Sequence, residues 1–169
     1  MLQLTEIDSP VGRLAIAAKD GRVCLLHFGG MTKSARAALA RWYPDSTVQS
    51  ATDPAGAIES LRAYFGGDIK AIDAIQVEMH GTPFQQKVWA ALRRIPVGTT
   101  LSYGRLARLI CEPSAVRAVG AANGANPVAL IVPCHRVIGS NGTLTGYGGG
   151  LDRKRWLLEH EGVRSQMLF

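Results

Sequence analysis

Residues 126–138 read NPVALIVPCHRVI, an apolar run that stops at Pro133 and is followed at once by Cys134 and His135. An unbroken apolar run predicts a buried strand over Val128 to Val132. A thiol beside an imidazole suits a nucleophile, because the thiolate is the reactive form and a neighbouring base can populate it near neutral pH. A buried cysteine is more often inert core, so the pair alone does not decide the function. A carboxylate could orient the imidazole, and Glu159 and Glu161 are both candidates.

The segment before this run has the pattern of three helices. Apolar residues at helical spacing from Phe84 to Ile95 predict the first helix, which Pro96-Val97-Gly98 ends. We expect Ser102 to cap a short second helix carrying Leu106, Ala107 and Ile110. Ser114 is expected to cap a third helix that runs to about Asn123. Two short helices joined by a tight turn predict a helix-turn-helix.

The third predicted helix has an outer face with few side chains. Its expected core side comprises Ala115, Val116, Ala118, Val119 and Ala122. Its outer side carries Arg117 among the small residues Gly120, Ala121 and Gly124. A helix that reads base edges in the major groove usually carries several polar side chains, whereas a bare helix with one arginine suits close approach through the minor groove. Small residues also permit tight helix packing, and that alternative stays open.

Positive charge is concentrated in the same region. Residues 87–117 carry six basic side chains against the single acidic Glu112, whereas residues 1–86 carry eight basic and nine acidic ones. A near-neutral first half and a basic middle are what a polyanion-binding site would produce, although a solvated basic face would look the same.

The first half has the pattern of a small sheet with helices. Strands are predicted over residues 14–18 and 23–28, joined by a turn in which Asp20-Gly21 supplies positive φ. Helices are predicted over residues 34–43 and 55–66, with Trp42 and Tyr43 in the core, and a further strand over residues 69–77. We therefore expect an α+β chain with a small antiparallel sheet in an N-terminal domain (1–78) and a mostly helical C-terminal domain (79–169).

Composition narrows the class of protein. A chain of 169 residues can bury a core without disulfides or a metal. No apolar run approaches the ~18 residues of a membrane span, and the first residues lack the pattern of a secretory signal. Three cysteines without paired spacing indicate reduced thiols, so we expect a cytoplasmic protein with no membrane partner.

Several motifs together closely resemble one family. They are Asn126-Pro127, the run from Pro133 to Gly139, and the stretch from Gly142 to Gly150. This set resembles the signature of the O6-alkylguanine-DNA alkyltransferases, also called methylated-DNA–protein-cysteine methyltransferases. The similarity extends back through residues 117–120, 102–104 and 81–89 and forward through residues 154–162, and it is loose in the N-terminal half.

The resemblance implies a ribonuclease-H-like topology for the first domain and a specific reaction for the second. Cys134 would accept an alkyl group from O6-alkylguanine once, irreversibly, after the base has left the stack. His135 would be the base, acting through a bound water, and Glu161 rather than Glu159 would orient it.

The resemblance also implies roles for the residues around Cys134. Asn126 would tie the third helix to the active-site strand. Tyr103, Val137, Tyr147 and Gly148 would bind the guanine, with the carbonyls of Cys134 and Val137 accepting from its exocyclic amine. Arg117 would fill the space left by the base, and Ala115, Gly120 and Ser102 would contact DNA. The expected partner is double-stranded DNA with O6-alkylguanine, with O4-alkylthymine as a second lesion, bound by a monomer or cooperatively.

The chain departs from the family pattern at some positions. Val116 stands where alanine is usual, Cys111 where glycine is usual, and Gly148 where some relatives have serine. Some members bind zinc in the N-terminal domain. Here Cys24 and His27 are present, but Thr5 occupies the region of another ligand, so we expect no metal and no cofactor. His80 and His160 are expected to be structural or surface residues.

Three rival functions remain at this point. An alkyltransferase-like sensor binds the same lesion but lacks the acceptor cysteine, which Cys134 argues against. A helix-turn-helix regulator would need direct sequence readout, which the bare third helix argues against. A cysteine hydrolase would turn over many times on an acyl substrate.

Overall fold

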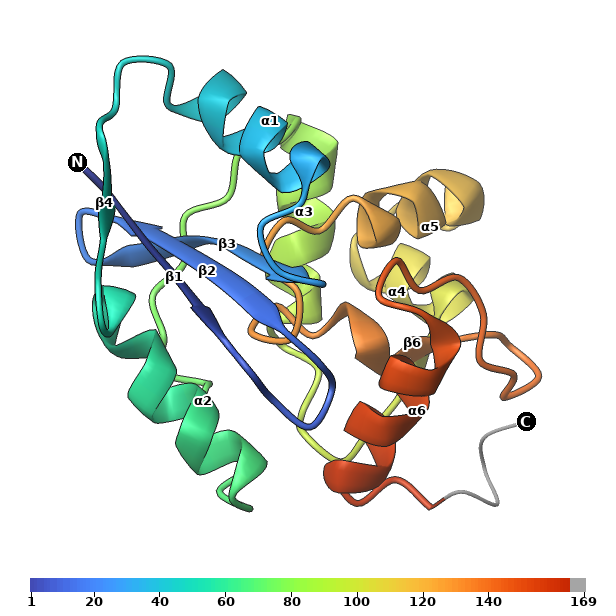
Figure 1. Ribbon diagram of the computed structural model, residues 1–169. Coiled ribbons are helices and arrows are strands. Elements are labelled where there is room, and N and C mark those ends of the chain that lie inside the picture. The colour runs from blue at the N-terminus through green and yellow to red at the C-terminus, as the bar shows by residue number, and fades with distance from the viewer. Residues whose placement is uncertain (165–169) are drawn as a thin grey trace. The chain divides into compact units, whose positions relative to one another are not determined.

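The computed structural model describes residues 1–164, which divide into two compact units. Unit 1 comprises Met1–His80 with Pro127–Ile131, and unit 2 comprises Gly81–Asn126 with the chain from Val132 onward. The last five residues of the predicted C-terminal domain, 165–169, lie outside the described part. Figure 1 shows the elements of both units.

Unit 1 is built on a four-stranded sheet. The strands are β1 (Leu2–Ile7), β2 (Leu14–Lys19), β3 (Arg22–Phe28) and β4 (Val48–Ser50), in the order β3-β2-β1-β4. The pairs β1–β2 and β2–β3 are antiparallel, but β4 runs parallel to β1. The sheet is therefore mixed: its three main strands are antiparallel, as expected of the small sheet, and the edge strand β4 joins them in parallel. The connection through α1 (Lys33–Trp42) returns the chain in the same direction as β1.

The predicted hairpin is confirmed in its details. Asp20 and Gly21 have φ of 50° and 75°, as a two-residue turn with positive φ at both central positions requires. Residues 69–77 were predicted to be a strand, and this was wrong. The chain turns there, through hydrogen bonds from Ala71 to Asp68 and from Asp73 to Lys70, and only Val77 forms a bridge, with Val23. Its apolar residues Ile72 and Ile75 are buried without being extended.

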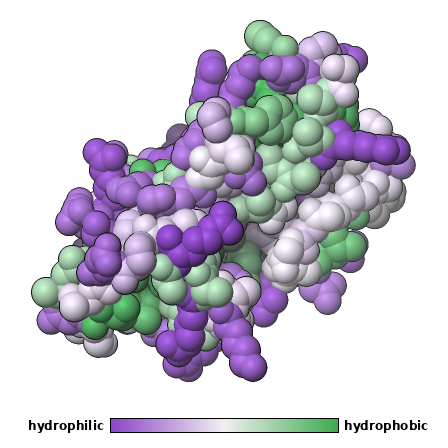
Figure 2. Space-filling view, turned by 90° about the horizontal axis from the view of Figure 1, so that it is seen from above, coloured by the Kyte–Doolittle hydropathy of each residue, from purple (hydrophilic) through white to green (hydrophobic). Residues whose placement is uncertain are grey.

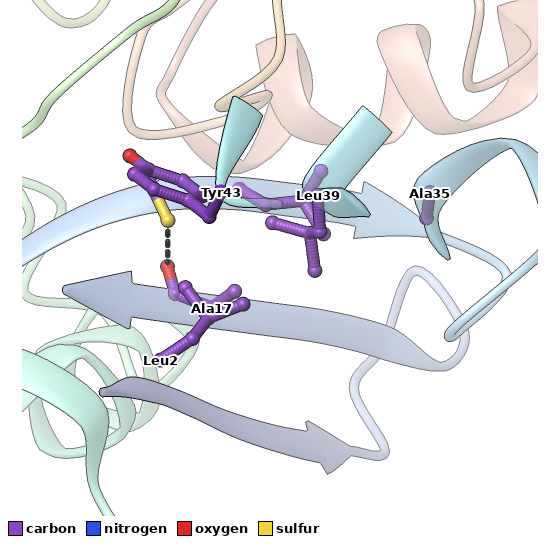
Figure 3. Packing of buried hydrophobic residues seen from close by; sticks show 7 residues of the cluster. Leu2, Ala17, Ala35, Leu39 and Tyr43 are labelled. Atoms are coloured by element: carbon purple, nitrogen blue, oxygen red, sulfur yellow. Dashed lines mark hydrogen bonds between the residues drawn. The ribbon is translucent and has the colours of Figure 1, made fainter. Parts of the chain in front are cut away.

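Helix α1 covers the sheet with its apolar side. Ala35, Leu39 and Tyr43 pack against Leu2 and Ala17, as Figure 3 shows. This cluster also contains Cys24, whose thiol donates to the Ala17 carbonyl at 3.5 Å. The short helix η1 (Pro54–Gly56) and α2 (Ala57–Phe65) follow β4, close to the predicted helix.

Unit 2 is mainly helical. Its helices are α3 (Pro83–Leu92), α4 (Tyr103–Leu109), α5 (Val116–Gly124) and α6 (Leu151–His160), with a short helix η2 (Cys134–Arg136). The two-residue strands β5 (Leu101–Ser102) and β6 (Val137–Ile138) pair in parallel. Thr82 and Gln85 form a capping box at the start of α3, and the Trp89 indole donates to the Ala122 carbonyl of α5 at 2.8 Å. Ser102 caps α4 as predicted, accepting from the Arg105 amide.

Two local predictions for α5 were wrong. Its N-cap is Ala115, with no side-chain hydrogen bond, so Ser114 does not cap it. Val116 and Ala118, expected on the core side, are exposed, and the buried residues are Val119, Ala122 and Asn123. The helix begins at Val116, after its N-cap Ala115, and Asn123 belongs to its buried face although the sequence pattern had not favoured it.

The run from Val128 to Val132 is buried as predicted, apart from the half-buried Ala129, but it is not a strand. Only Val128 bridges to a strand residue, Leu26. The Ile131 amide bonds to the Ala129 carbonyl across Leu130, whose φ is 70°, which is a γ-turn of the rarer positive-φ kind. These residues are buried without forming the hydrogen-bond ladder of a sheet. Apolar content predicts their burial but not whether they pair with a strand.

The surface of the described part carries few large apolar residues. Met1, Val48, Leu109, Val116 and Leu151 are exposed. On the face in Figure 2, long hydrophilic side chains stand among smaller and less polar residues. Within residues 1–164 no helix has the length and apolar character that crossing a membrane would need.

Candidate active site

Cys134 begins a tight turn that fixes three functional side chains in succession. Pro133 has φ −83° and ψ 65°, and the Cys134 amide bonds to the Val132 carbonyl across it at 2.8 Å, which is an inverse γ-turn. The short helix η2 then carries Cys134, His135 and Arg136, which are 5%, 0% and 3% exposed. A thiol and two ionisable groups are therefore buried on three consecutive residues.

Glu161 joins the two ionisable groups of this turn. Its Oε1 accepts from His135 Nε2 at 2.8 Å, and its Oε2 accepts from Arg136 Nε at 2.9 Å. Arg136 Nη1 also donates to the Ile95 carbonyl at 2.8 Å. Burial alone would raise the pKa of Glu161, but His135 and Arg136 hold it at about 2. Glu161 is 2% exposed whereas Glu159 is exposed, so Glu161 is the carboxylate that contacts the imidazole.

This contact sets the state of the imidazole. A carboxylate ionised at neutral pH only accepts, so His135 Nε2 carries the proton and donates it. Burial lowers the pKa of His135, against the opposing effect of Glu161, so the ring is neutral at rest. Nδ1 is then a bare acceptor, and it is buried without a hydrogen bond within residues 1–164. His135 is thus prepared to accept a proton at Nδ1.

The thiol of Cys134 is surrounded by groups that favour its ionised form. Burial raises the pKa of the Cys134 thiol, while the Asn126 side chain, the Lys154 charge and the Tyr147 side chain act in the opposite direction. Cys134 therefore rests as a thiol and needs a base to ionise it. The pKa of the Cys24 thiol is also raised, to about 11, chiefly by burial, with a hydrogen bond to Tyr43 acting against it and the charge of Glu78 adding to it.

Two asparagines hold the backbone of this turn. Asn126 Nδ2 donates to the Val132 carbonyl at 2.8 Å, and Asn123 Nδ2 donates to the Cys134 carbonyl at 3.4 Å. Asn123 lies on α5 and is 2% exposed. Asn126 thus bonds to the segment before Cys134, and Asn123 adds a second bond, to Cys134 itself, that the sequence reasoning missed.

The loop before α6 carries other predicted site residues. Tyr103, at the start of α4, donates to the Thr145 carbonyl at 3.2 Å, and a Cβ on Gly120 would lie 3.9 Å from its ring. Tyr147 is half-buried and Gly148 is exposed in the same loop, whereas Val137 is buried in β6. The structure thus brings Tyr103 against this loop.

The predicted DNA-contacting residues lie on α4 and α5. Arg117 is exposed, Ala115 and Gly120 are partly exposed, and Ser102 is used as a helix cap. The turn between the helices includes Cys111, exposed and with φ 61°. Glycine is the residue that this backbone conformation favours. Cys111 stands where glycine is usual, so it places a side chain on a strained backbone position.

Lys154 and Arg136 were missed by the sequence reasoning. Lys154 was hidden in the basic run Arg153-Lys154-Arg155, which is typical of a solvated face. The helical positions 154, 157, 158 and 161 share one side, however, and all four side chains are buried. That spacing is the signal that would have placed Lys154 on the buried side of α6.

No cluster of three or more His, Cys, Asp or Glu side chains in residues 1–164 has the arrangement of a metal site. His80 contacts the Tyr43 hydroxyl at 2.9 Å, and His160 stacks on Trp156. Both histidines therefore contact aromatic side chains of the protein.

Comparison with known proteins gives consistent results for both halves of the chain. Residues 3–79 match the family model of the 6-O-methylguanine DNA methyltransferase ribonuclease-like domain, and residues 83–163 match that of the DNA binding domain. A methylated-DNA–protein-cysteine methyltransferase of Mycobacterium bovis is 46% identical over 98% of this chain and 95% of its own length.

Two further relatives extend the comparison. One of the same name from Salmonella typhimurium is 58% identical over 113 residues, which are 67% of this chain and 66%, just under two thirds, of that protein. A crystal structure of Mycobacterium tuberculosis OGT in complex with DNA superposes with a TM-score of 0.78 at 43% identity, over 94% of this chain and 92% of the other.

Proposed function

Because the chain belongs to the 6-O-methylguanine DNA methyltransferase family, we propose that it repairs DNA by direct reversal. It binds double-stranded DNA and transfers the alkyl group of O6-alkylguanine to its own Cys134. It is thus a methylated-DNA–protein-cysteine methyltransferase that acts once per molecule. The observation that carries the proposal is a buried thiol on the same turn as a histidine that a buried glutamate orients.

The reaction begins with ionisation of the thiol. His135 Nδ1 takes the proton of Cys134, directly or through a bound water, while Glu161 stabilises the imidazolium that forms. The thiolate sulfur attacks the alkyl carbon, so that an S–C bond forms while the C–O6 bond breaks. Guanine leaves with the bonding electron pair and takes up one proton, which balances the proton lost by the thiol. The thioether has no easy route back, so each molecule reacts once.

The alkylated base must leave the duplex to reach a sulfur that is 5% exposed. Arg117 enters the duplex from the minor groove and occupies the gap, which offsets part of the few kcal/mol that unstacking costs. Ala115, Gly120 and Ser102 accompany it at the DNA surface. The exposed small residues of α5 support this arrangement, because a helix with few side chains can approach the backbone closely.

The guanine is held by groups around Cys134. Tyr103 closes the pocket and assists rotation of the nucleotide, and the carbonyls of Cys134 and Val137 accept from its exocyclic amine. Tyr147 and the Gly148 amide donate near O6, where charge grows as the C–O6 bond breaks. O4-alkylthymine presents similar chemistry and is a second candidate lesion. No cofactor takes part, and the reaction takes place in a cytoplasmic monomer or a cooperative assembly on DNA.

The domain boundary that accompanies this function falls between residues 78 and 79. The N-terminal domain supports the fold, and the domain from residue 79 carries DNA binding and chemistry. The described part of that second domain contains every residue to which the proposal assigns a role.

Mass spectrometry tests the proposal against its rivals. The protein is mixed with a duplex that contains a single O6-methylguanine, and the peptide with Cys134 should gain the mass of one CH₂. The Cys134→Ala variant should show no gain, whereas Cys24→Ala, which removes the other buried thiol, should keep it. Lesion binding without any mass gain would favour a sensor, and repeated turnover on an acyl substrate would favour a hydrolase.

A further inference from the structure

Asn123 is a buried polar residue on α5 with one hydrogen-bonding atom that the proposed reaction has not used. Its side chain lies on the inner face of the helix with Val119 and Ala122, and the residue is 2% exposed. Its Nδ2 donates to the Cys134 carbonyl at 3.4 Å, whereas its Oδ1 is buried and forms no hydrogen bond in the described part of the chain. A buried acceptor without a donor is costly, so this oxygen indicates a partner that arrives from outside the protein.

The bond to Cys134 fixes which end of the carboxamide is the free oxygen. A backbone carbonyl only accepts, so the amide nitrogen must face Cys134, and the opposite orientation would bring two oxygens together. The nitrogen and the oxygen share one carbon, so Oδ1 lies close to the Cys134 carbonyl. That carbonyl has two lone pairs, and the bond from Asn123 takes up one of them. Two acceptors with capacity to spare, Oδ1 and the Cys134 carbonyl, are therefore held near each other at the residue that carries the sulfur.

Tyr103 lies on the same side of α5 as Asn123. A Cβ on Gly120 would lie 3.9 Å from the Tyr103 ring, and Asn123 follows Gly120 by three residues, which places both on one face of the helix. Burial raises the pKa of Tyr103, and the Asn123 side chain is among the groups that act in the opposite direction, as an amide close to the hydroxyl would. Asn123 thus adjoins both the residue that closes the proposed guanine pocket and the residue that accepts the alkyl group.

The chemistry of the lesion identifies the donor that this oxygen would take. Alkylation of O6 leaves N1 without a proton, so the exocyclic amine holds the donors on that edge of the base. We propose that Asn123 is a specificity-determining residue that reads the exocyclic amine of the flipped guanine, through Oδ1 directly and through the Cys134 carbonyl that its Nδ2 orients. This inference rests on the proposed function, because it assigns a role within the same site. O4-alkylthymine has a carbonyl oxygen in place of this amine, so acceptors would face an acceptor and the site would favour guanine.

The test removes the amine from the lesion and the carboxamide from the protein. Duplexes carry either O6-methylguanine or O6-methylhypoxanthine, which has hydrogen in place of the amine, at the same position. The rate of methyl transfer to Cys134 is measured in a single turnover, with protein in excess, for the wild type and for Asn123→Leu, which keeps a similar side-chain volume without a donor or an acceptor. We expect loss of the amine to slow the wild type about tenfold more than it slows Asn123→Leu, because the variant has already lost the contact.

The ratio of the two rates separates recognition of the amine from support of the fold. A variant that only loosened the turn at Cys134 would react more slowly with both lesions by the same factor. Asn141→Leu removes an exposed asparagine that bonds to Thr143 and should keep the wild-type ratio. An equal effect of the amine in the wild type and in Asn123→Leu, or the same change of ratio in Asn141→Leu, would overturn the proposal. Transfer from neither duplex by the wild type would refute the proposed function itself, and this inference with it.

The thymine lesion gives the opposite sign. With O4-methylthymine, loss of the Asn123 oxygen removes a repulsion, so the rate in Asn123→Leu should rise relative to the rate with O6-methylguanine. An unchanged ratio between these two lesions would contradict the role assigned to Oδ1.

A second measurement does not depend on the folding of any Asn123 variant. Cys134→Ser keeps the backbone carbonyl of residue 134 but lacks the thiol, so it holds either purine lesion unreacted. NMR of the Asn123 side-chain amide in this variant should show different resonances with the O6-methylguanine duplex and with the O6-methylhypoxanthine duplex. Identical resonances in the two complexes would refute contact between Asn123 and the amine.

Discussion

Replacing Glu161 by glutamine should destabilise the protein strongly, because the carboxylate neutralises a buried arginine. Glu161 accepts from His135 at 2.8 Å and from Arg136 at 2.9 and 3.1 Å. Glutamine has the same shape but no charge, so Arg136, which is 3% exposed, keeps an unpaired charge. Breaking a buried ion pair at one side costs about 3–5 kcal/mol. A pKa of Glu161 near 2, against a usual 4.5, gives a similar ~3 kcal/mol.

Thermal unfolding followed by circular dichroism measures this effect. For a chain of this size, ~3 kcal/mol lowers Tm by roughly 6–12 °C. The matched control is Glu159→Gln, which removes an exposed carboxylate two positions earlier on the same helix and should leave Tm unchanged. Adding Arg136→Met to Glu161→Gln removes the unpaired charge and should recover part of the loss. If Glu161→Gln unfolded within 1 °C of the wild type, the reasoning about this pair would be refuted.

Three further outcomes follow from the same structure. The free energy of unfolding should fall as the pH drops below about 6.5, and further between about pH 5 and pH 2. His135 and Glu161 both have lowered pKa values in the folded protein, so both bind protons more readily when the chain is unfolded. Urea unfolding at a series of pH values measures this, and a stability that fell as the pH was raised through this range would contradict it. Cys111→Gly should stabilise the folded protein by about 0.5 kcal/mol, because the strain of a non-glycine residue at φ 61° exceeds the unfolded-state entropy that a glycine adds. Cys111→Ala keeps the Cβ and should show no such gain in the urea midpoint. Arg117→Ala should slow methyl transfer from duplex DNA and leave iodoacetamide alkylation of Cys134 unchanged, and a loss of both would show that the arginine acts on the sulfur.

Local patterns predicted the hairpin and the helices well. Asp20-Gly21 has positive φ at both central positions of its turn, and Ser102 caps α4. In each case the local backbone conformation depends on residues that lie within a few positions of it in the sequence. Such features can be read from the sequence because no distant contact is needed to form them.

The errors occurred where distant contacts decide the backbone. Apolar residues 69–77 and 128–132 have the composition of strands, yet the first turns on itself and the second contains a γ-turn at Leu130. The edge strand β4 pairs in parallel with β1. Its three residues, Val48–Ser50, are all exposed and have no pattern that predicts this pairing. Burial could be predicted for the apolar runs, but hydrogen-bond partners far along the chain could not.

The order of residues in the site also shows why adjacency in sequence is not contact in space. A 3-10 turn advances by about 120° per residue, so the side chains of Cys134, His135 and Arg136 diverge. His135 and Arg136 both reach Glu161, while the side chains that lower the pKa of Cys134 are Asn126, Lys154 and Tyr147. The sulfur is therefore controlled by residues from three separate segments. The Cys-His pair lies on one turn, but the carboxylate that contacts the imidazole is Glu161 at the C-terminal end of α6, 26 residues further along the chain.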